Sequence, residues 1–271
     1  MQTYSLGPIS MIASLWQQRS LLLAMTVRDI GGRYKGSAMG LAWSMAIPLL
    51  MLLVYTAVFG GIFKARWGGS GSTTDFSLQL FCGLVLHGMV AECLLRSPQK
   101  LIEHSSYVKK VVFPLEILPV TGVGGALFHA VISLLLLLLA VLFLRGGLPV
   151  TVLAVPIVLL PLVLFCAGIS WFLAAITVYL RDITQLTGLL ATLLLFLSPI
   201  FYPLEMIPEA FRGFMTFNPL TVPVEQLRLV VLAGEWPDWP LLGVHGLACL
   251  AVTWLGYAWF QKTRKGFADV L

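Results

Sequence analysis

An uncharged, strongly apolar run from residue 38 to residue 63 limits what this chain can fold into. The basic residues Arg33 and Lys35 precede the run, and Lys64 follows it. An α-helix rises 1.5 Å per residue, so about 20 apolar residues cross the hydrocarbon core of a bilayer. The run is long enough, and it predicts a membrane-spanning helix.

Further apolar runs follow, separated by polar or broken segments. With 59% hydrophobic and 11% charged residues, the chain lies far from the roughly 25% charged residues of soluble domains. The sequence therefore predicts an all-α, polytopic membrane protein with one transmembrane domain over residues 38–261. The six expected spans cover about residues 38–63, 78–95, 120–144, 152–179, 184–202 and 241–260.

The basic residues predict the orientation of these spans. With the N-terminus inside, twelve of the 17 Lys and Arg residues fall in inner segments. Cytoplasmic loops of membrane proteins carry this excess, so both termini, including the tail 262–271, are expected in the cytoplasm. The same bias explains the net charge of +5 and argues against binding of nucleic acid.

Residues 1–37 predict a cytoplasmic N-terminus with an amphipathic helix in the membrane interface, and a solvated leader is the alternative. The apolar stripe of that helix consists of Ile9, Ile12, Trp16, Leu23 and Val27.

Two segments between the spans have a distinct character. Residues 96–119 are the most polar internal segment, and they predict a helix along the membrane surface that suits docking of a soluble partner. Residues 204–240 contain two stretches, 208–217 and 222–233, that are too short to span. These predict short re-entrant helices in the outer leaflet.

Motifs of the common hydrolytic and nucleotide-binding sites are absent from the sequence. It contains no HExxH, GxSxG, CxxC or GxxxxGK[ST], and its four histidines lie on separate segments without metal-like spacing. The chain is therefore expected to be no enzyme and to bind no metal or cofactor. Interhelical hydrogen bonds are the expected role of buried histidines.

Glu92 is the acidic residue placed well inside a predicted span. Ionisable groups there are costly and mark functional candidates. Arg96 lies one helical turn further and offers an ion pair, which we favour over contact with a substrate. With so few carboxylates and no repeated halves, a proton-driven carrier is disfavoured, and a partner ATPase is the expected energy source.

Four ordered motifs carry a resemblance to a known family: RYKGSAMGLAWSMAIPLLMLLVYTAVFG, FPLEILP, VYLRDI, and the stretch from SPIFYPLEMIP to FNPL. Together they resemble the membrane subunits of type-2 ABC exporters. The most similar branch exports polysaccharides (the Wzm and TagG type: O-antigen, teichoic acid or capsule).

The resemblance implies six transmembrane helices, an N-terminal interface helix and re-entrant helices between spans five and six. It also implies a channel formed with a second copy of the chain, in the bacterial inner membrane. Two copies of a separate nucleotide-binding subunit would hold ATP and Mg. The cargo would be a lipid-linked polysaccharide. A type-2 exporter of a small hydrophobic drug or natural product is the alternative.

The resemblance also assigns residue roles. Arg33, Tyr34 and Lys35 would form a substrate entrance that meets the pyrophosphate of a lipid-linked glycan, with simple positive-inside anchoring as the alternative. Channel-lining aromatic residues would be Tyr55, Phe59, Phe63, Trp171, Phe196, Phe201 and Tyr202, with interface anchoring as the alternative. A periplasmic gate would comprise Met206, Phe211, Phe214 and Met215. Coupling to the ATPase would involve Lys109, Lys110, Phe113, Pro114, Glu116, Arg181 and Asp182.

Overall fold

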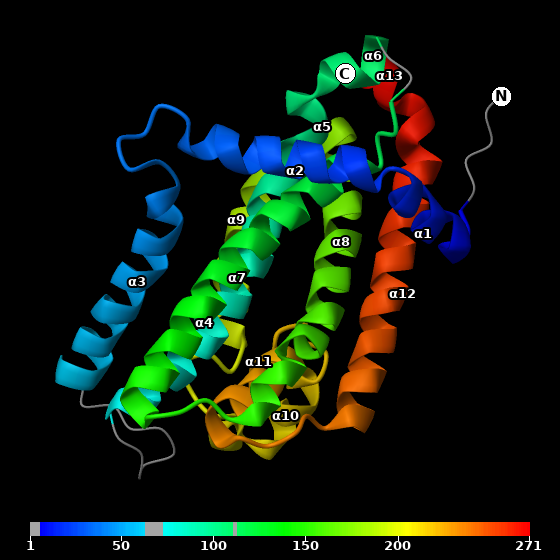
Figure 1. Cartoon of the computed structure of the whole chain (residues 1–271). Helices are drawn as coiled ribbons and strands as arrows, with labels where there is room; N and C mark the ends of the chain where they lie inside the picture. Colours follow the sequence, from blue (N-terminus) through cyan, green and yellow to red (C-terminus); the bar gives the residue numbers. More distant parts are fainter. Residues whose placement is uncertain (1–5, 63–72, 111–112) are drawn as a thin grey trace.

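A computed structural model describes residues 6–62, 73–110 and 113–271, and no strand occurs within them. Long helices run side by side and form a bundle, and α2 crosses over one end of it (Figure 1). Within these described residues, five helical stretches are long and apolar enough to cross a membrane: Gly40–Ile62, Thr74–Glu103, Ile117–Arg145, Val150–Tyr179 and Trp239–Val270. The expected all-helical, multi-pass architecture is confirmed.

These stretches are built from the following helices. The first joins η1 (Gly40–Ala42), α3 (Trp43–Tyr55) and the π-helical η2 (Thr56–Ile62). The second is α4 (Thr73–Arg96) with η4 (Ser97–Gln99) and α5 (Lys100–Glu103), and the third is α7 (Ile117–Arg145). The fourth joins η5 (Val150–Ala154) to α8 (Val155–Tyr179), and the fifth joins α12 (Trp239–Thr263) to η8 (Arg264–Gly266) and α13 (Phe267–Val270).

The expected fifth span is shorter than predicted. Helix α9 (Ile183–Leu197) has 15 residues, which correspond to about 22 Å of helix. Ser198 adopts an extended backbone directly before Pro199, because a residue that precedes proline is disfavoured in the helical conformation. The helix therefore ends five residues before the approximate bound at residue 202, at the break that Ser198 and Pro199 predict.

The N-terminal segment forms two helices where one was expected. Helix α1 (Pro8–Gln17) and helix α2 (Arg19–Tyr34) are separated at Gln18, whose φ of −98° and ψ of 14° leave the helical range. Helix α2 packs across α7 and buries Met25. The predicted apolar stripe lies on uncovered faces: Ile9, Ile12, Trp16, Leu23 and Val27 are all more than 60% exposed.

Helices α8 and α12 approach each other most closely. A Cβ atom on Gly256 of α12 would lie 2.1 Å from the backbone oxygen of Gly168 on α8, so only glycine permits this crossing. Helix α4 packs against α7, α8 and α9, and its apolar residues contribute a large part of the main core. Helix α3 differs, because Ser44 is its one buried residue.

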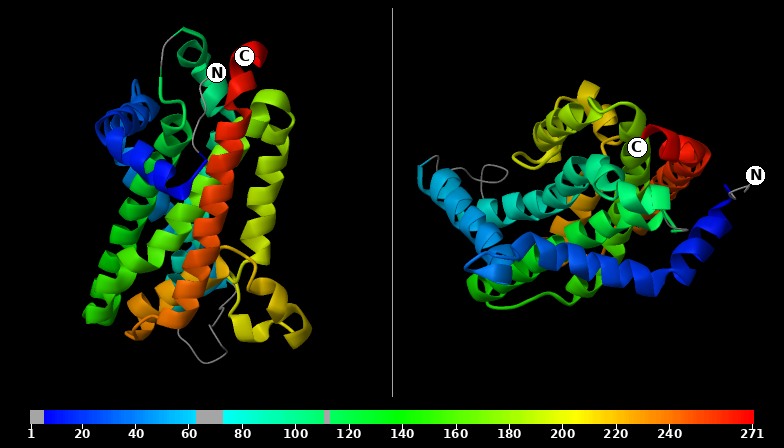
Figure 2. Two further views of the ribbon diagram at one scale, coloured as in Figure 1. Left: turned by 90° about the vertical axis from the view of Figure 1, so that its right-hand side faces the viewer. Right: turned by 90° about the horizontal axis from the view of Figure 1, so that it is seen from above.

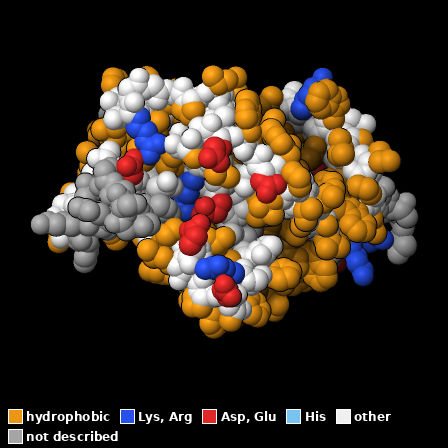
Figure 3. Space-filling model, turned by 90° about the horizontal axis from the view of Figure 1, so that it is seen from below, with side chains coloured by type: hydrophobic (Ala, Val, Ile, Leu, Met, Phe, Trp, Pro, Cys, Tyr) orange, Lys and Arg blue, Asp and Glu red, His pale blue; other side chains and the backbone are white. Residues whose placement is uncertain are grey.

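The segment after α9 contains the two short helices that the sequence predicts. Helix α10 (Glu209–Met215) is exposed, whereas α11 (Thr221–Arg228), continued by the π-helical η7 (Leu229–Ala233), is buried against α4, α8 and α12. Seen from this end, charged side chains gather near the middle of the face, and hydrophobic side chains occupy much of its outline (Figure 3).

The opposite end carries α5, α6 (Ser105–Lys110), α13 and the turn between α8 and α9 (Figures 1 and 2). The single helix expected over 96–119 is broken into short pieces. Pro98 lies in the first turn of η4, which begins at Ser97, and His104 leaves the helical conformation with φ −109° and ψ 28°. Helices α1 and α13 lie toward this same end, as expected for two termini on one side (Figure 2).

Candidate functional site

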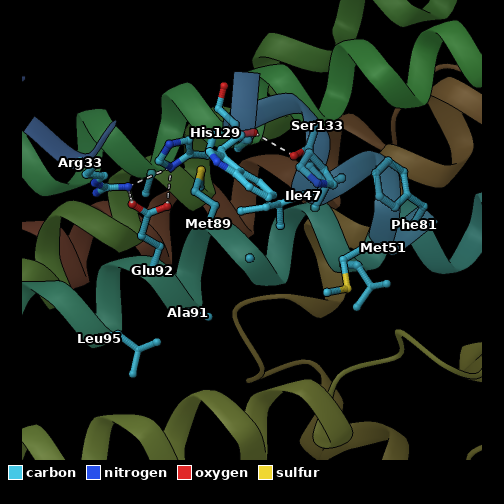
Figure 4. Close-up of a pocket in the computed structure, with 18 of the residues that line it drawn as sticks. Arg33, Ile47, Met51, Phe81, Met89, Ala91, Glu92, Leu95, His129 and Ser133 are labelled. Atoms are coloured by element: carbon cyan, nitrogen blue, oxygen red, sulfur yellow. Dashed lines mark hydrogen bonds and ion pairs between the residues drawn. The ribbon is translucent and has the colours of Figure 1, made fainter. Parts of the chain in front are cut away.

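A cavity of about 650 Å³ lies between α3, α4 and α7, and the C-terminal turn of α2 borders it. Its wall is polar at one end and apolar elsewhere. Figure 4 shows Glu92 pointing toward Arg33 and His129, with Phe81 and Met51 at the other side of the view. The cavity thus joins an ionic cluster to an aromatic and aliphatic wall.

The ionic cluster brings together α2, α4 and α7. The Glu92 carboxylate on α4 contacts the guanidinium of Arg33 from α2. Its other oxygen lies 2.8 Å from Nδ1 of His129 on α7, and Arg96 Nε lies 3.5 Å from the first oxygen. The predicted pair with Arg96 is present, but Arg33 and His129 are the closer partners.

His129 links this cluster to Tyr34. An ionised carboxylate only accepts hydrogen bonds, so Nδ1 of His129 donates to Glu92. The other ring nitrogen, Nε2, lies 2.8 Å from the Tyr34 hydroxyl, and the two rings meet edge to face. The last turn of α2 is therefore tied to both α4 and α7.

Glycine on α7 makes room for this arrangement. A Cβ atom on Gly125 would lie 3.1 Å from Arg33 Nη2, and one on Gly124 would lie 2.7 Å from the Thr26 side chain. These glycines admit side chains of α2 to the surface of α7. Lys35, the third residue of the predicted entrance, is exposed at the end of α2.

Several predicted channel aromatics do gather beyond the cavity. Tyr55 lines the cavity and lies 6.2 Å from Phe59, measured between ring centroids. Phe59 in turn lies 5.6 Å from Phe76 and 6.1 Å from Phe201, and Phe196 stacks on Phe201 at 5.8 Å.

Tyr202 is held by a hydrogen bond to the backbone. The Tyr202 hydroxyl donates to the backbone oxygen of Phe196 at 2.9 Å. Phe63 lies outside the described residues.

Trp171 occupies a different place from the one the sequence suggests. It is 0% exposed, packs against Tyr257 at 5.2 Å, and donates its indole N–H to the backbone oxygen of Glu116 at 2.8 Å. It offers no surface to a channel within this chain, and the channel-lining interpretation is wrong for this residue. A buried indole needs an acceptor, and the Glu116 carbonyl supplies it.

The residues of the predicted gate lie on and next to α10. Met206, Phe211 and Phe214 are more than half exposed, and Met215 is half-buried. Arg212 fixes this loop by donating to the backbone oxygens of Glu205 at 2.7 Å and Ile207 at 2.8 Å.

Glu116, predicted to couple to an ATPase, is a buried internal anchor. Its carboxylate accepts from Ser14 of α1 at 2.7 Å and pairs with Arg264 of η8 at 2.7 Å. Arg264 also donates to the Phe113 backbone oxygen at 2.9 Å. The carboxylate is used within the chain, so a direct contact of Glu116 with a partner is not supported.

The remaining coupling candidates are more accessible. Lys109, Arg181 and Asp182 are exposed, Pro114 is half-buried, and the half-buried Phe113 ring stacks on Tyr107 at 4.7 Å. The side chain of Lys110 lies outside the described part of the chain.

The half-buried His87 has a structural partner, and the cysteines are enclosed in the fold. Nε2 of His87 on α4 lies 2.9 Å from the Ala191 backbone oxygen on α9, which is the interhelical bond predicted for a buried histidine. The four cysteines are free and buried. Over residues 6–62, 73–110 and 113–271, no cluster of His, Cys, Asp and Glu has the composition to hold a metal ion.

Sequence reasoning missed two of the three partners of Glu92. His129 carried a usable signal, because it is the one ionisable side chain within the apolar stretch 120–144. The sequence around Arg33 gave no such signal, because the contact of Arg33 with Glu92 depends on how α2 crosses the bundle.

Comparisons with known proteins agree with this architecture. The family described as ABC-2 type transporter matches residues 20–232. A Klebsiella pneumoniae protein named O-antigen export system permease protein RfbA is 28% identical over 253 residues, covering 93% of this chain and 95% of that protein. The Myxococcus xanthus protein of the same name is 28% identical over 265 residues, covering 96% and 99%.

Proposed function

The chain belongs to the ABC-2 type transporter family, and from this premise we propose that it is the permease subunit of an ATP-driven exporter of a lipid-linked polysaccharide, most specifically of the O-antigen type. The names of its full-length relatives support this cargo at 27–28% identity. Membership of the family supports a role in transport. The identity of the cargo is argued from the residues of the cavity.

The cavity carries the proposal. Its polar end presents the guanidinium groups of Arg33 and Arg96, which suit the phosphate oxygens that join a glycan to its lipid. Beyond it, Tyr55, Phe59 and Phe201 form a continuous aromatic group. Flat aromatic faces contact the apolar faces of sugar rings without fixing one hydrogen-bonded pose, which suits a polymer that slides.

The proposed assembly contains two copies of the chain and two copies of a nucleotide-binding subunit that holds ATP and Mg. Helix α9 acts as the fifth of six spans in spite of its 15 residues, and α1 and α2 lie in the cytoplasmic interface of the bacterial inner membrane. Both termini face the cytoplasm, where the ATPase docks on α5, α6 and the turn between α8 and α9. Lys109, Arg181 and Asp182 are the exposed residues for that contact.

The second copy covers α3. Within a single chain this helix exposes large apolar side chains, among them Leu49, Leu50 and Leu53. Lipid can cover part of this surface. A partner α3 would complete a channel wall on which Tyr55 and Phe59 already lie.

The experiment is glycan export in cells that lack their own permease. Arg33→Gln is expected to reduce surface glycan at least about tenfold, since one charge-assisted contact contributes about 1.5–3 kcal/mol. Arg19→Gln is the matched control, because Arg19 also lies on α2 but contacts Trp16 at the surface. Membrane level and ATPase association must be equal in both variants.

Undiminished glycan export by the Arg33 variant would refute a substrate role and leave positive-inside anchoring as the reason for this residue. The alternative cargo, a small hydrophobic drug or natural product, is tested in the same strains. If the chain lowers accumulation of such compounds while glycan stays inside the cell, the polysaccharide proposal is wrong.

A further inference from the structure

We propose that the cavity contains an anion-binding site in which the Glu92 carboxylate takes the place of a bound anion. By competing for the same guanidinium groups, Glu92 makes the site selective for a diphosphate over the monoanionic phospholipids of the membrane. The inference rests on the proposed function, because it concerns the headgroup by which the lipid-linked cargo would enter. It adds to that function a role for Glu92, which excludes monoanionic phospholipids from the site.

The charges of the cluster are unequal. One carboxylate, Glu92, is shared by two guanidinium groups and an imidazole N–H, from Arg33, Arg96 and His129. Even with a neutral histidine, the group carries one positive charge more than it needs for internal pairing. With Glu92 in place, the surplus of one charge suits one anionic charge, and displacement of Glu92 would release a second guanidinium, that of Arg33. An anion of more than one charge therefore gains most from the site.

The cluster is also reachable. Arg33, Arg96, Glu92 and His129 all line the cavity, and Arg96 keeps 46% of its side chain exposed. An anion inside the cavity would meet Arg96 first and then the guanidinium that Glu92 occupies. The Tyr34 hydroxyl, 2.8 Å from His129, adds a further polar group on the same side.

Competition with Glu92 explains the selectivity. A tethered carboxylate acts at a high effective concentration, in the millimolar range or above. A phosphodiester with a single charge interacts with the Arg33 guanidinium no more strongly than Glu92 does. It therefore does not displace Glu92. A diphosphate has more charge and enough oxygens to bridge Arg33 and Arg96 with paired hydrogen bonds.

Displacement would also change the fold locally. Glu92 is the group through which α4 holds the last turn of α2, and His129 is bound to the same carboxylate. When a diphosphate takes over Arg33, the direct tie between α2 and α4 is replaced by a tie through the ligand. Arrival of the cargo is thereby linked to the position of α2.

Asp29 provides an internal comparison. It lies on α2, whereas Glu92 lies on α4, and it is as enclosed as Glu92, with 16% against 17% of the side chain exposed. Its partner is Lys100, a single cation, and Thr121 adds a hydrogen bond at 3.3 Å. This pair is balanced in charge and does not line the cavity, so it should have no influence on anion selectivity.

The test measures binding to the full-length chain in nanodiscs of zwitterionic lipid. The ligands are phosphatidylglycerol, a polyprenyl monophosphate and a polyprenyl diphosphate, with inorganic pyrophosphate as a soluble competitor. The wild type should prefer the diphosphate over phosphatidylglycerol by at least about tenfold, the ratio that one extra charge-assisted contact gives. Strong competition by pyrophosphate would indicate a site for the free anion; weak competition indicates that the lipid tail contributes.

Glu92→Gln should bind phosphatidylglycerol on the order of tenfold more tightly and so lose most of the preference. Glu92→Asp should keep it, and Asp29→Asn should leave it unchanged. An unaltered preference in the Glu92→Gln variant, or an equal change in Asp29→Asn, overturns the inference.

If the Glu92→Gln protein fails to fold, lipid binding by the wild type alone still tests the inference. If phosphatidylglycerol binds as tightly as the diphosphate, Glu92 is no selective occupant and the inference is wrong. If the wild type binds no polyprenyl phosphate of either kind, the proposed cargo is wrong as well. The two failures are therefore distinguishable.

Discussion

Replacement of Arg228 by methionine should strongly weaken the end of the bundle that carries α10 and α11. Its side chain is 4% exposed and donates to three backbone oxygens: those of Gln79 at 3.1 Å, Pro199 at 2.7 Å and Ile200 at 3.1 Å. It also pairs with Glu225 at 2.7 Å. These contacts connect α11, the start of α4 and the segment after α9.

The magnitude follows from what the substitution leaves behind. Methionine fills a similar volume but donates nothing, so three enclosed carbonyls and one carboxylate lose a charged donor. Breaking a buried ion pair at one partner costs about 3–5 kcal/mol, and the loss expected here is near the lower end because the Glu225 side chain is 32% exposed. For a domain of this size, such a loss lowers the unfolding temperature by on the order of 10 °C.

Arg212→Met is the matched control. Arg212 also donates to two backbone oxygens, at 2.7 and 2.8 Å, but it lies on the exposed helix α10, where water replaces the lost bonds. Its expected effect is about 1 kcal/mol or less. Thermal unfolding of the purified proteins in detergent, followed by tryptophan fluorescence, measures both. Equal losses in the two variants would refute the argument from burial.

Three further predictions concern the helix crossing and two ion pairs. Gly256→Leu should destabilise the bundle by about 1–3 kcal/mol or prevent folding, because its Cβ would lie 2.1 Å from the backbone oxygen of the facing glycine; unchanged thermal stability would contradict the crossing. Burial raises the pKa of Asp29, but the hydrogen bond and charge of Lys100 outweigh burial and hold that pKa below its ordinary 3.8. Its contribution to stability is thus present above that value and lost as the pH falls through the lower folded value, so Asp29→Asn should flatten the acid limb of a stability curve. Glu116→Arg and Arg264→Glu should each lower ATP-driven export, and the double exchange should restore it in part, as a transport assay with matched protein levels would show.

The apolar periodicity of the sequence predicts the long helices well. The stretches expected at 120–144 and 241–260 correspond to α7 (Ile117–Arg145) and α12 (Trp239–Thr263) within a few residues. Errors arise where a local backbone preference overrides hydrophobicity. The residue before Pro199 ends α9, and Gln18 divides the N-terminal helix, although the apolar residues continue on both sides.

The candidate site was harder to predict, because its residues meet only through tertiary packing. The i,i+4 relation of Glu92 and Arg96 is local and was found. The contacts of Glu92 with Arg33 and His129 depend on how α2 crosses α4 and α7, which no local pattern encodes. Hydrophobic aromatic residues are similarly ambiguous: Tyr55 lines the cavity, whereas Trp171 is enclosed in the core.

The glycine contact between α8 and α12 distinguishes a rigid part of the bundle from a part that is free to move. Two helices whose backbones touch at Gly168 and Gly256 cannot slide or rotate past each other without collision, so this pair acts as a stationary frame. Helix α3 has no such lock and buries only Ser44. Of the two, α3 is therefore the helix whose tilt can change the width of the cavity, and the polysaccharide cargo proposed above would be accommodated by such a tilt.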